Sequence, residues 1–340
     1  MRKLLNTIYV TKEDAYLKLE NENLVVEQEG KKIFRIPFEN VENIVCFSYL
    51  GCSPELMGKC VEKTIPINFI SPYGKFWAKV IGMTKGNVFL RVEQIDRFRE
   101  NKIDLCKNTV LAKLKNTAHL IKRTLHDHEE MRNDPEILGV IDRLNESMKK
   151  LEKSSDADEI LGIEGSCARE YFSIFGKLIT NSVLSDEFHL RTKRPPLDSV
   201  NAVLSFLYTM ATNDYAAALE VVGLDSYIGF YHCLRSGRVS LACDLVEEVR
   251  CLVERFTISM INLHVISDAD FEHQISGAVY LNDDGRKKIL QKWQEKKRED
   301  IVHPYLDQKI PLGLLPYVQA NLLAKYVRGE LDMYPPYLLP

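Results

Sequence analysis

The segment HCLRSGRVSLACDLVEEVRCLVERF, from His232 to Phe256, decides how this sequence folds. From Leu241 onward it is mostly apolar, as in a helix surrounded by protein, yet it carries Asp244, Glu247 and Glu248. At about 100° per residue, these three carboxylates share one narrow face of a helix. Burying an unpaired charge is costly. Such carboxylates are therefore solvated along one stripe, paired with cations, or bound to a metal ion.

The composition is that of a globular protein with a substantial core. The chain has 340 residues, 45% of them hydrophobic and 27% charged, and its formal net charge is −3. This length favours two domains. The small net charge identifies no partner, so any nucleic-acid surface must come from local clusters of Lys and Arg.

The sequence also predicts the compartment. It contains no apolar segment typical of a signal peptide or a membrane-spanning helix. Its eight cysteines form no CxxC pair, and zinc sites or disulfide frameworks would need such spacings. We interpret the cysteines as small buried residues and predict a cytoplasmic protein with no membrane contact.

Two kinds of pattern divide the chain. β-branched and aromatic residues alternate or cluster in residues 7–10, 15–38, 41–47, 66–70 and 76–82, with turn signals at ENEN, EGKK and SPYG. Ser53 and Pro54 open a short helical pattern between these strands. After Gly86 the pattern becomes helical, with one long helix expected from Leu90 to His128. The sequence predicts an α+β multidomain fold: a small N-terminal β-rich domain, residues 1–88, and a larger, mainly α-helical catalytic domain, residues 89–340.

Two further segments bear on the carboxylates. LGIEGSCAREYFSIFG places Glu164 at the expected start of an amphipathic helix, where it would alternatively only complement the helix dipole. DSYIGFYHCL ends an aromatic run at His232, which would alternatively be a core histidine. Hard oxygen ligands with one imidazole suit Mg²⁺ or Mn²⁺. Such a site activates a nucleophilic oxygen and stabilises a phosphoryl-transfer transition state.

Basic residues gather in three segments of the chain. They lie in residues 91–123, in RTKRPP and in GRKKILQKWQEKKR. Each alone is typical of a solvated helix face, but together they favour a surface that follows DNA phosphates. Walker, Rossmann and GxSxG motifs are missing, so ATP hydrolysis, hydride transfer and serine hydrolysis have no support. The DNA-binding candidates in the last two segments are Arg191, Lys193, Arg194, Arg286, Lys287 and Lys288.

Four motifs in order then resemble a known family. They are GIEGSCAREYF, KRPPLDSVNAVLSFLY, GLDSYIGFYH and SLACDLVEEVR. Together they resemble the CRISPR-associated integrase/endonuclease family (Cas-one), the catalytic subunit of spacer acquisition in antiviral defence. The resemblance covers essentially the whole chain. The flanking stretches MRKLLNTIYV, SPYGKFWAKV and GLLPYVQANLLAKYVRGELDMYPPYL are most similar to the type I-C branch.

The resemblance implies roles for single residues. The family's metal-binding glutamate falls on Glu164, its histidine on His232 and its distal acidic ligand on Glu247. Asp244 matches an additional acidic position, and Arg250 a position where a basic residue can approach DNA. Many members have aspartate where this chain has Glu247, so the resemblance leaves open whether Asp244 or Glu247 is the direct ligand. All four acidic and histidine residues are candidates for catalysis and for binding Mg²⁺ or Mn²⁺.

The implied function is metal-dependent integration of prespacer DNA into the repeat array. A 3′-hydroxyl attacks a phosphodiester, and water at the same site gives nuclease activity. The implied partners are double-stranded DNA, a second copy of the chain joined through the β-domain, and a small second adaptation subunit (Cas-two) in a heterohexamer. Two alternatives stay open: a stand-alone metal-dependent DNA endonuclease of repair or recombination, and a non-catalytic helical DNA-binding scaffold.

Overall fold

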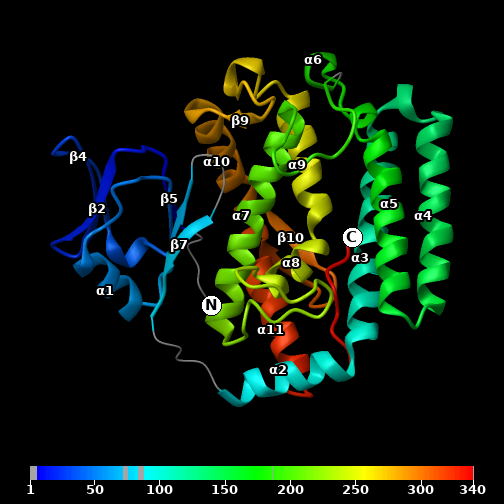
Figure 1. Cartoon of the computed structure of the whole chain (residues 1–340), viewed down its shortest axis with the longest axis horizontal. Coiled ribbons are helices and arrows are strands. Elements are labelled where there is room, and N and C mark those ends of the chain that lie inside the picture. The colour runs from blue at the N-terminus through cyan, green and yellow to red at the C-terminus, as the bar shows by residue number, and fades with distance from the viewer. Residues whose placement is uncertain (1–5, 72–75, 83–87, 186, 340) are drawn as a thin grey trace.

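A computed structural model describes residues 6–71, 76–82, 88–185 and 187–339. The strands of the N-terminal part gather on one side of the molecule, and helices make up most of the rest (Figure 1). Most of the expected SPYG turn lies outside the described residues. None of the helices in these ranges is long and apolar enough to cross a membrane. The α+β fold class predicted from the sequence is confirmed.

The N-terminal part contains two small sheets and one helix. In the first sheet β1, β5 and β6 run parallel and β7 pairs antiparallel with β6. Ser53 caps α1 as expected, since its Oγ accepts a hydrogen bond from the Leu56 N–H at 3.2 Å. The elements are β1 (Thr7–Val10), β5 (Asn43–Cys46), β6 (Ile67–Ile70) and β7 (Phe76–Val80), then the antiparallel β2 (Ala15–Glu20), β3 (Asn23–Gln28) and β4 (Lys31–Pro37), and α1 (Pro54–Glu62).

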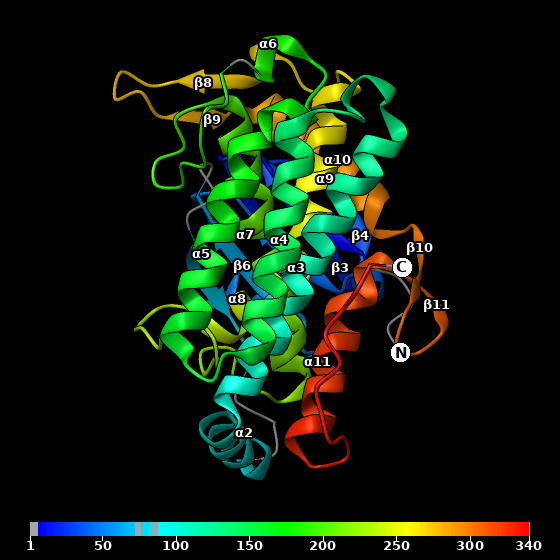
Figure 2. The same ribbon diagram turned by 90° about the vertical axis from the view of Figure 1, so that its right-hand side faces the viewer.

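The helical part surrounds α7, most of whose residues are buried. Helices α3, α4 and α5 stand together as an outer layer, which faces the viewer in Figure 2. The helices are α2 (Val88–Glu100), α3 (Lys102–Asp127), α4 (Pro135–Lys153), α5 (Ala157–Ile174), α6 (Ser182–Ser185), α7 (Ser199–Val222), α8 (Ser240–Glu247), α9 (Arg250–Asn262), α10 (Asp283–Lys297) and α11 (Leu315–Val327), with the ribbons β8 (Phe271–His273) to β9 (Val279–Leu281) and β10 (Asp300–His303) to β11 (Gln308–Pro311).

The long helix expected from Leu90 to His128 is wrong, because it breaks at Asn101. There the backbone leaves the helical region (φ −111°, ψ 23°), and α2 turns across the foot of α3 (Figure 1). The buried Gln94 explains this turn, since its amide donates to the carbonyls of Asp225 and Ile228 at 2.9 Å each. Helix α2 therefore holds the segment that leads to His232.

The N-terminal and helical parts of the chain also pack against each other. Phe47, beyond the end of β5, stacks on Phe206 of α7 with ring centroids 6.1 Å apart. The described part of the sheet ends at Val80 and the first long helix begins at Val88. The boundary between residues 88 and 89 stays a prediction.

Candidate active site

Two glutamates from different helices converge on one lysine. Lys113 of α3 forms an ion pair with Oε1 of Glu164 on α5, and its Nζ lies 2.6 Å from Oε2 of Glu247 at the end of α8. These side chains are only 12%, 15% and 6% exposed, respectively. Helix α3 packs against both α5 and α8, which brings distant parts of the sequence together. We call Lys113, Glu164, His232 and Glu247 the carboxylate site.

Glu164 lies within its helix, so the expectation that it opens that helix is wrong. Helix α5 begins earlier, after Asp156, whose carboxylate accepts a hydrogen bond from the Glu159 N–H at 3.2 Å. Interaction with the helix dipole is confined to the first turn. The alternative that Glu164 only complements the dipole therefore fails too. Its position is explained by what it faces, which is Lys113.

Asp244 is fully buried, and the protein itself uses all its acceptor positions. Its Oδ1 accepts hydrogen bonds from the His232 N–H at 2.9 Å and from His232 Nδ1 at 2.7 Å. Its Oδ2 accepts from the N–H groups of Phe230 at 2.7 Å and Tyr231 at 3.1 Å. A carboxylate offers about four such positions. Of the two acidic residues between which the sequence does not choose, Glu247 is thus the one with an oxygen facing the carboxylate site.

The orientation of His232 follows from Asp244. Because a carboxylate only accepts hydrogen bonds, Nδ1 is the donor, and Nε2 then lies 3.9 Å from Oε1 of Glu247. Carboxylate groups hold metal-binding imidazoles in this way and fix which nitrogen is free. The alternative of an ordinary core histidine is disfavoured, because Nε2 faces charged groups.

Arg250 supports Glu247 from α9. Its Nη1 donates to Oε1 of Glu247 at 2.9 Å, and its guanidinium lies 4.4 Å from the ring centroid of Tyr208. Burial alone would raise the pKa of Glu247, but three basic neighbours, Arg250 foremost, hold that pKa well below its usual range. Glu247 is therefore ionised at neutral pH. The predicted contact of Arg250 with DNA stays a prediction, since the guanidinium is engaged inside the protein.

Glu248, the third carboxylate of the expected face, does not belong to the carboxylate site. The helix expected from Leu241 onward ends at Glu247 and resumes at Arg250, because Val249 adopts a non-helical backbone (φ −117°, ψ 7°). Glu248 keeps helical backbone angles (φ −67°, ψ −26°), so its side chain points about 100° around the axis from that of Glu247 and faces the C-terminal segment. The expectation that all three carboxylates share one face is wrong for this reason.

Glu248 instead contacts the C-terminal segment. Oε2 of Glu248 accepts hydrogen bonds from Gln319 at 2.8 Å, from the Tyr334 hydroxyl at 3.1 Å and from the Tyr337 N–H at 2.9 Å. Asn116 of α3 adds a second anchor, donating to the carbonyls of Glu248 at 2.8 Å and Tyr337 at 2.9 Å. Tyr334 and Tyr337 are thus part of the core, and their segment lies beside α11 and α3 (Figure 2).

The basic residues before α7 differ in their exposure. Arg191 is used within the protein, since it donates to Asn201 Oδ1 at 2.7 Å and Ser205 Oγ at 3.1 Å. Lys193 and Arg194 are exposed. Although Lys193 keeps an exposed surface, neighbouring protein atoms partly desolvate its ammonium, and this desolvation and then the charges of Arg250 and Arg191 lower its pKa. Lys193 therefore lies near the charged groups around the carboxylate site.

The basic residues of α10 are only partly on the surface. The prediction that Arg286 belongs to a surface cluster is wrong, because its side chain is buried and donates to the Leu281 carbonyl at 2.7 Å. Lys288 forms an ion pair with Asp270 at 2.7 Å, and Lys287 is exposed. Of the three candidates in α10, Lys287 is the one best placed to meet a phosphate.

The donor set of the carboxylate site suits a hard divalent cation. It combines two carboxylates, one of them held ionised, with an imidazole whose second nitrogen is already fixed. Oε2 of Glu247 is buried and, among the described residues, has no hydrogen bond of good geometry, although Lys113 lies close to it. Among the described residues, no group of three His, Cys, Asp or Glu side chains has the arrangement needed to hold a metal ion. The ammonium of Lys113 lies between Glu164 and Glu247, at the point where such an ion would bind.

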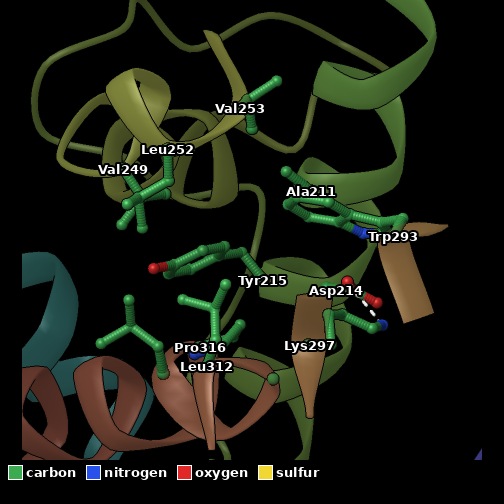
Figure 3. A pocket seen from close by; sticks show the side chains of 12 residues that line it. Ala211, Asp214, Tyr215, Val249, Leu252, Val253, Trp293, Lys297, Leu312 and Pro316 are labelled. Carbon is green, nitrogen blue, oxygen red and sulfur yellow. Dashed lines mark hydrogen bonds and ion pairs between the residues drawn. The ribbon is translucent and has the colours of Figure 1, made fainter. Parts of the chain in front are cut away.

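A small cavity lies apart from the carboxylate site. It has a volume of about 40 Å³, and its apolar wall includes Val249, Leu252 and Trp293 (Figure 3). The ion pair of Asp214 with Lys297, 3.0 Å long, closes one side. It shares no residue with the carboxylate site. Its lining offers little chemistry, so we do not assign the function to it.

Comparison with known proteins identifies the family. The family described as CRISPR associated protein Cas1 matches residues 8–295. CRISPR-associated endonuclease Cas1 2 of Rhodospirillum rubrum is 44% identical over 99% of both chains, and Cas1 1 of Chlorobaculum tepidum is 39% identical over the same shares. The chain belongs to the CRISPR-associated Cas1 family. The type I-C assignment stays a prediction.

Solved Cas1 structures share the fold. A Cas1 protein from Thermotoga maritima, TM1797, superposes with a TM-score of 0.81 at 24% identity, covering 95% of this chain and 97% of that one. A casposase bound to its integration product reaches 0.84 at 18% identity, covering 96% and 92%. At these identities the likeness concerns the fold alone.

Sequence reasoning missed two residues of this Cas1 site. Lys113 lies among the basic residues of 91–123, and nothing in the local pattern sets it apart from its neighbours. Tyr231 precedes His232, and burial followed by the nearby charges of Glu164 and Glu247 raises the pKa of its hydroxyl. Its place beside the histidine was the available signal. Lys113 is identified by contacts between helices, and Tyr231 by its place beside His232 in the loop before α8.

Proposed function

We propose that this Cas1 protein is a metal-dependent DNA integrase and endonuclease of CRISPR adaptation that uses Mg²⁺ or Mn²⁺. The observation that carries the proposal is the convergence of Glu164 and Glu247 on a single cation, with His232 Nε2 beside them. Family membership supports the same activity, since the relatives are named endonucleases. The ligands would be Glu164, His232 and Glu247, with Asp244 positioning the histidine.

The reaction is a phosphoryl transfer. The 3′-oxygen of the incoming strand forms a new P–O bond at a repeat phosphodiester, while the P–O bond to the departing 3′-oxygen breaks. The proton of the attacking hydroxyl ends on the departing oxygen. When water attacks instead, the products are those of a nuclease. A bound divalent ion would polarise the phosphate and lower the pKa of the attacking hydroxyl.

The protein's own residues prepare this site. Asp244 fixes the imidazole through Nδ1, so that Nε2 keeps its lone pair for the ion. Arg250 holds the Glu247 carboxylate in place and, against the effect of burial, keeps it ionised. Tyr231 covers the side of the histidine, with the two ring centroids 5.1 Å apart. Little movement of these groups is then needed during the reaction.

The proposed partners are DNA, a second copy of the chain and a small second adaptation subunit. Lys193, Arg194 and Lys287 supply exposed charge for the DNA backbone. Tyr49 and Trp77 of the β-rich part are exposed and lie 4.9 Å apart between ring centroids, which suits burial in a homodimer. A chain of the same fold occurs in a Cas6-RT-Cas1–Cas2 complex, which supports the second subunit. The heterohexamer and the cytoplasmic location are proposed with them.

The experiment is a strand-transfer assay with Mn²⁺ or Mg²⁺. It combines a short duplex bearing free 3′-hydroxyls, a supercoiled repeat plasmid, the small subunit, and either wild-type protein or Glu164→Gln. The matched control is Glu170→Gln, on the same helix but paired with Arg143. We expect joined product with the wild type and the control, and none with Glu164→Gln.

The remaining outcomes separate the alternatives. Cleavage without joining in the presence of the small subunit would point to a stand-alone endonuclease. Equal products from wild type and Glu164→Gln would show that Glu164 plays no part in the chemistry. DNA binding without metal-dependent products would leave the non-catalytic scaffold.

A further inference from the structure

The ammonium of Lys113 occupies the point at which Glu164 and Glu247 meet. It is the only cation paired with Glu164 among the residues that the structure describes, whereas Glu247 also has Arg250. Its Nζ lies 2.6 Å from Oε2 of Glu247, yet that oxygen lacks a hydrogen bond of good geometry. The contact therefore balances charge more than it fits lone pairs.

Charge explains why a cation is needed at this point. Without Lys113, two nearly buried carboxylates would face each other, and Glu164 would have no ion pair in the described part of the chain. Carboxylates close enough to share one ammonium repel each other strongly, and an unpaired buried charge is costly. A dication would relieve the same repulsion. An ammonium left beside that dication would itself be repelled.

We propose that Lys113 is the resident counter-cation of the metal-free site and competes with a divalent ion for Glu164 and Glu247. This inference rests on the metal site of the proposed function. A lysine suits the role, because its charge ends a flexible four-carbon chain that can withdraw while α3 stays in place. Lys113 is then a positioning residue that keeps the two carboxylates together until the ion arrives.

A competing role and a purely structural role of Lys113 predict opposite changes in metal affinity when the lysine is removed. If Lys113 only stabilises the fold, its removal lowers both the melting temperature and the affinity for metal. If it competes with the ion, its removal lowers the melting temperature of the metal-free protein but raises the affinity. We expect binding of Mn²⁺ to become tighter by roughly tenfold or more, as for the loss of one charge close to a cation site.

The test measures Mn²⁺ binding without DNA, from the EPR signal of the free ion, together with metal-free melting temperatures. Lys113→Met removes the charge and Lys113→Arg keeps it. Lys115→Met is the matched control, an exposed lysine on the same helix. Lys113→Met should melt lower and bind Mn²⁺ at least roughly tenfold tighter. The other two variants should bind as the wild type does.

If Lys113→Met does not fold, crystal structures of the wild type with and without Mn²⁺ test the inference instead. The ion should displace Nζ from both carboxylates. If the wild type binds Mn²⁺ and Lys113→Met binds it equally or more weakly, the counter-cation role alone is overturned. The same holds if Lys113 stays paired with both carboxylates beside the bound ion. Failure of all the proteins to bind Mn²⁺ overturns the metal site, and this inference with it.

Discussion

His232 Nδ1 donates to Asp244 Oδ1 at 2.7 Å, and this contact directs the other ring nitrogen toward Glu247. The same carboxylate gathers the backbone N–H groups of Phe230 and Tyr231. One buried side chain thus sets both the path of the loop and the orientation of the ring. Disturbing it should affect metal binding without touching a ligand.

Replacing Asp244 with Asn tests this relationship. The amide keeps the shape, but its NH₂ group faces hydrogen-bond donors that need an acceptor. We expect a loss of about 1–3 kcal/mol in the free energy of unfolding. Affinity for Mn²⁺ should fall about 10- to 100-fold, as for other partners of metal-binding histidines. Chemical unfolding and Mn²⁺ titration measure the two effects, and Asp142→Asn, on the surface of α4, is the control. Unchanged affinity would show that Asp244 does not position the ligand.

Gly229 leaves no room for a side chain beside Asp244. A Cβ there would lie 2.5 Å from Asp244 Oδ2 and 2.9 Å from the carbonyl carbon of Ser240. Because Ser240 contributes backbone, Gly229→Ala should shift the loop, destabilise the protein by about 1–3 kcal/mol and weaken Mn²⁺ binding. Gly162 of α5 has open space around its Cβ position. Gly162→Ala should stabilise the helix by about 0.5–1 kcal/mol. Thermal unfolding of both variants measures these changes in stability. Equal changes for Gly229→Ala and Gly162→Ala would contradict the steric argument.

The sequence predicts features that depend on local pattern. The Ser53 cap is an interaction within a few residues, so the order of residue types is enough to reveal it. The i, i+3 spacing of Asp244 and Glu247 likewise places both on neighbouring helix positions. Which of them faces the carboxylate site depends on the four donors around Asp244, all of which come from residues 230–232 in the loop before α8.

Helix breaks escape prediction for the same reason. Neither Asn101 nor Val249 is a strong helix breaker, and both lie in continuous helical patterns. Gln94 anchors α2 to a loop far along the chain, and the C-terminal segment contributes hydrogen bonds to Glu248, just before the break at Val249. These contacts form between distant segments and override local propensity. Lys113 is hidden in the same way, because its importance depends on two carboxylates from other helices.

Two buried tyrosines of α7 should respond differently to loss of the hydroxyl. The Tyr208 hydroxyl donates to Glu254 at 2.6 Å. The Tyr215 hydroxyl is buried and has no hydrogen-bond partner among the described residues. Tyr208→Phe should therefore cost about 1–2 kcal/mol, whereas Tyr215→Phe should be neutral or stabilising. Urea unfolding of the pair measures the difference. A clear loss in Tyr215→Phe would reveal a partner, such as a buried water, that the protein contacts do not include.

The last prediction concerns Glu248 and the C-terminal segment. Burial raises the pKa of Glu248 to about 7, from an ordinary value of 4.5, despite the three donors to Oε2. Because the pKa is raised on folding, the stabilisation is complete below pH 4.5 and is lost as the pH rises to 7. The difference of 2.5 units corresponds to a loss on the order of 3 kcal/mol across that window.

Glu248→Gln should remove this loss, because glutamine keeps an acceptor for the donors from Gln319, Tyr334 and Tyr337 but does not ionise. We expect the variant to be no more stable than the wild type near pH 5 and more stable near pH 8. Unfolding in urea at several pH values gives the difference between the two proteins, in which the other titrating groups largely cancel. Tyr334→Phe, which removes one donor to Glu248, should steepen the wild-type decline. A difference independent of pH would mean that Glu248 titrates as an ordinary carboxyl, because its three hydrogen-bond donors fully offset the effect of burial.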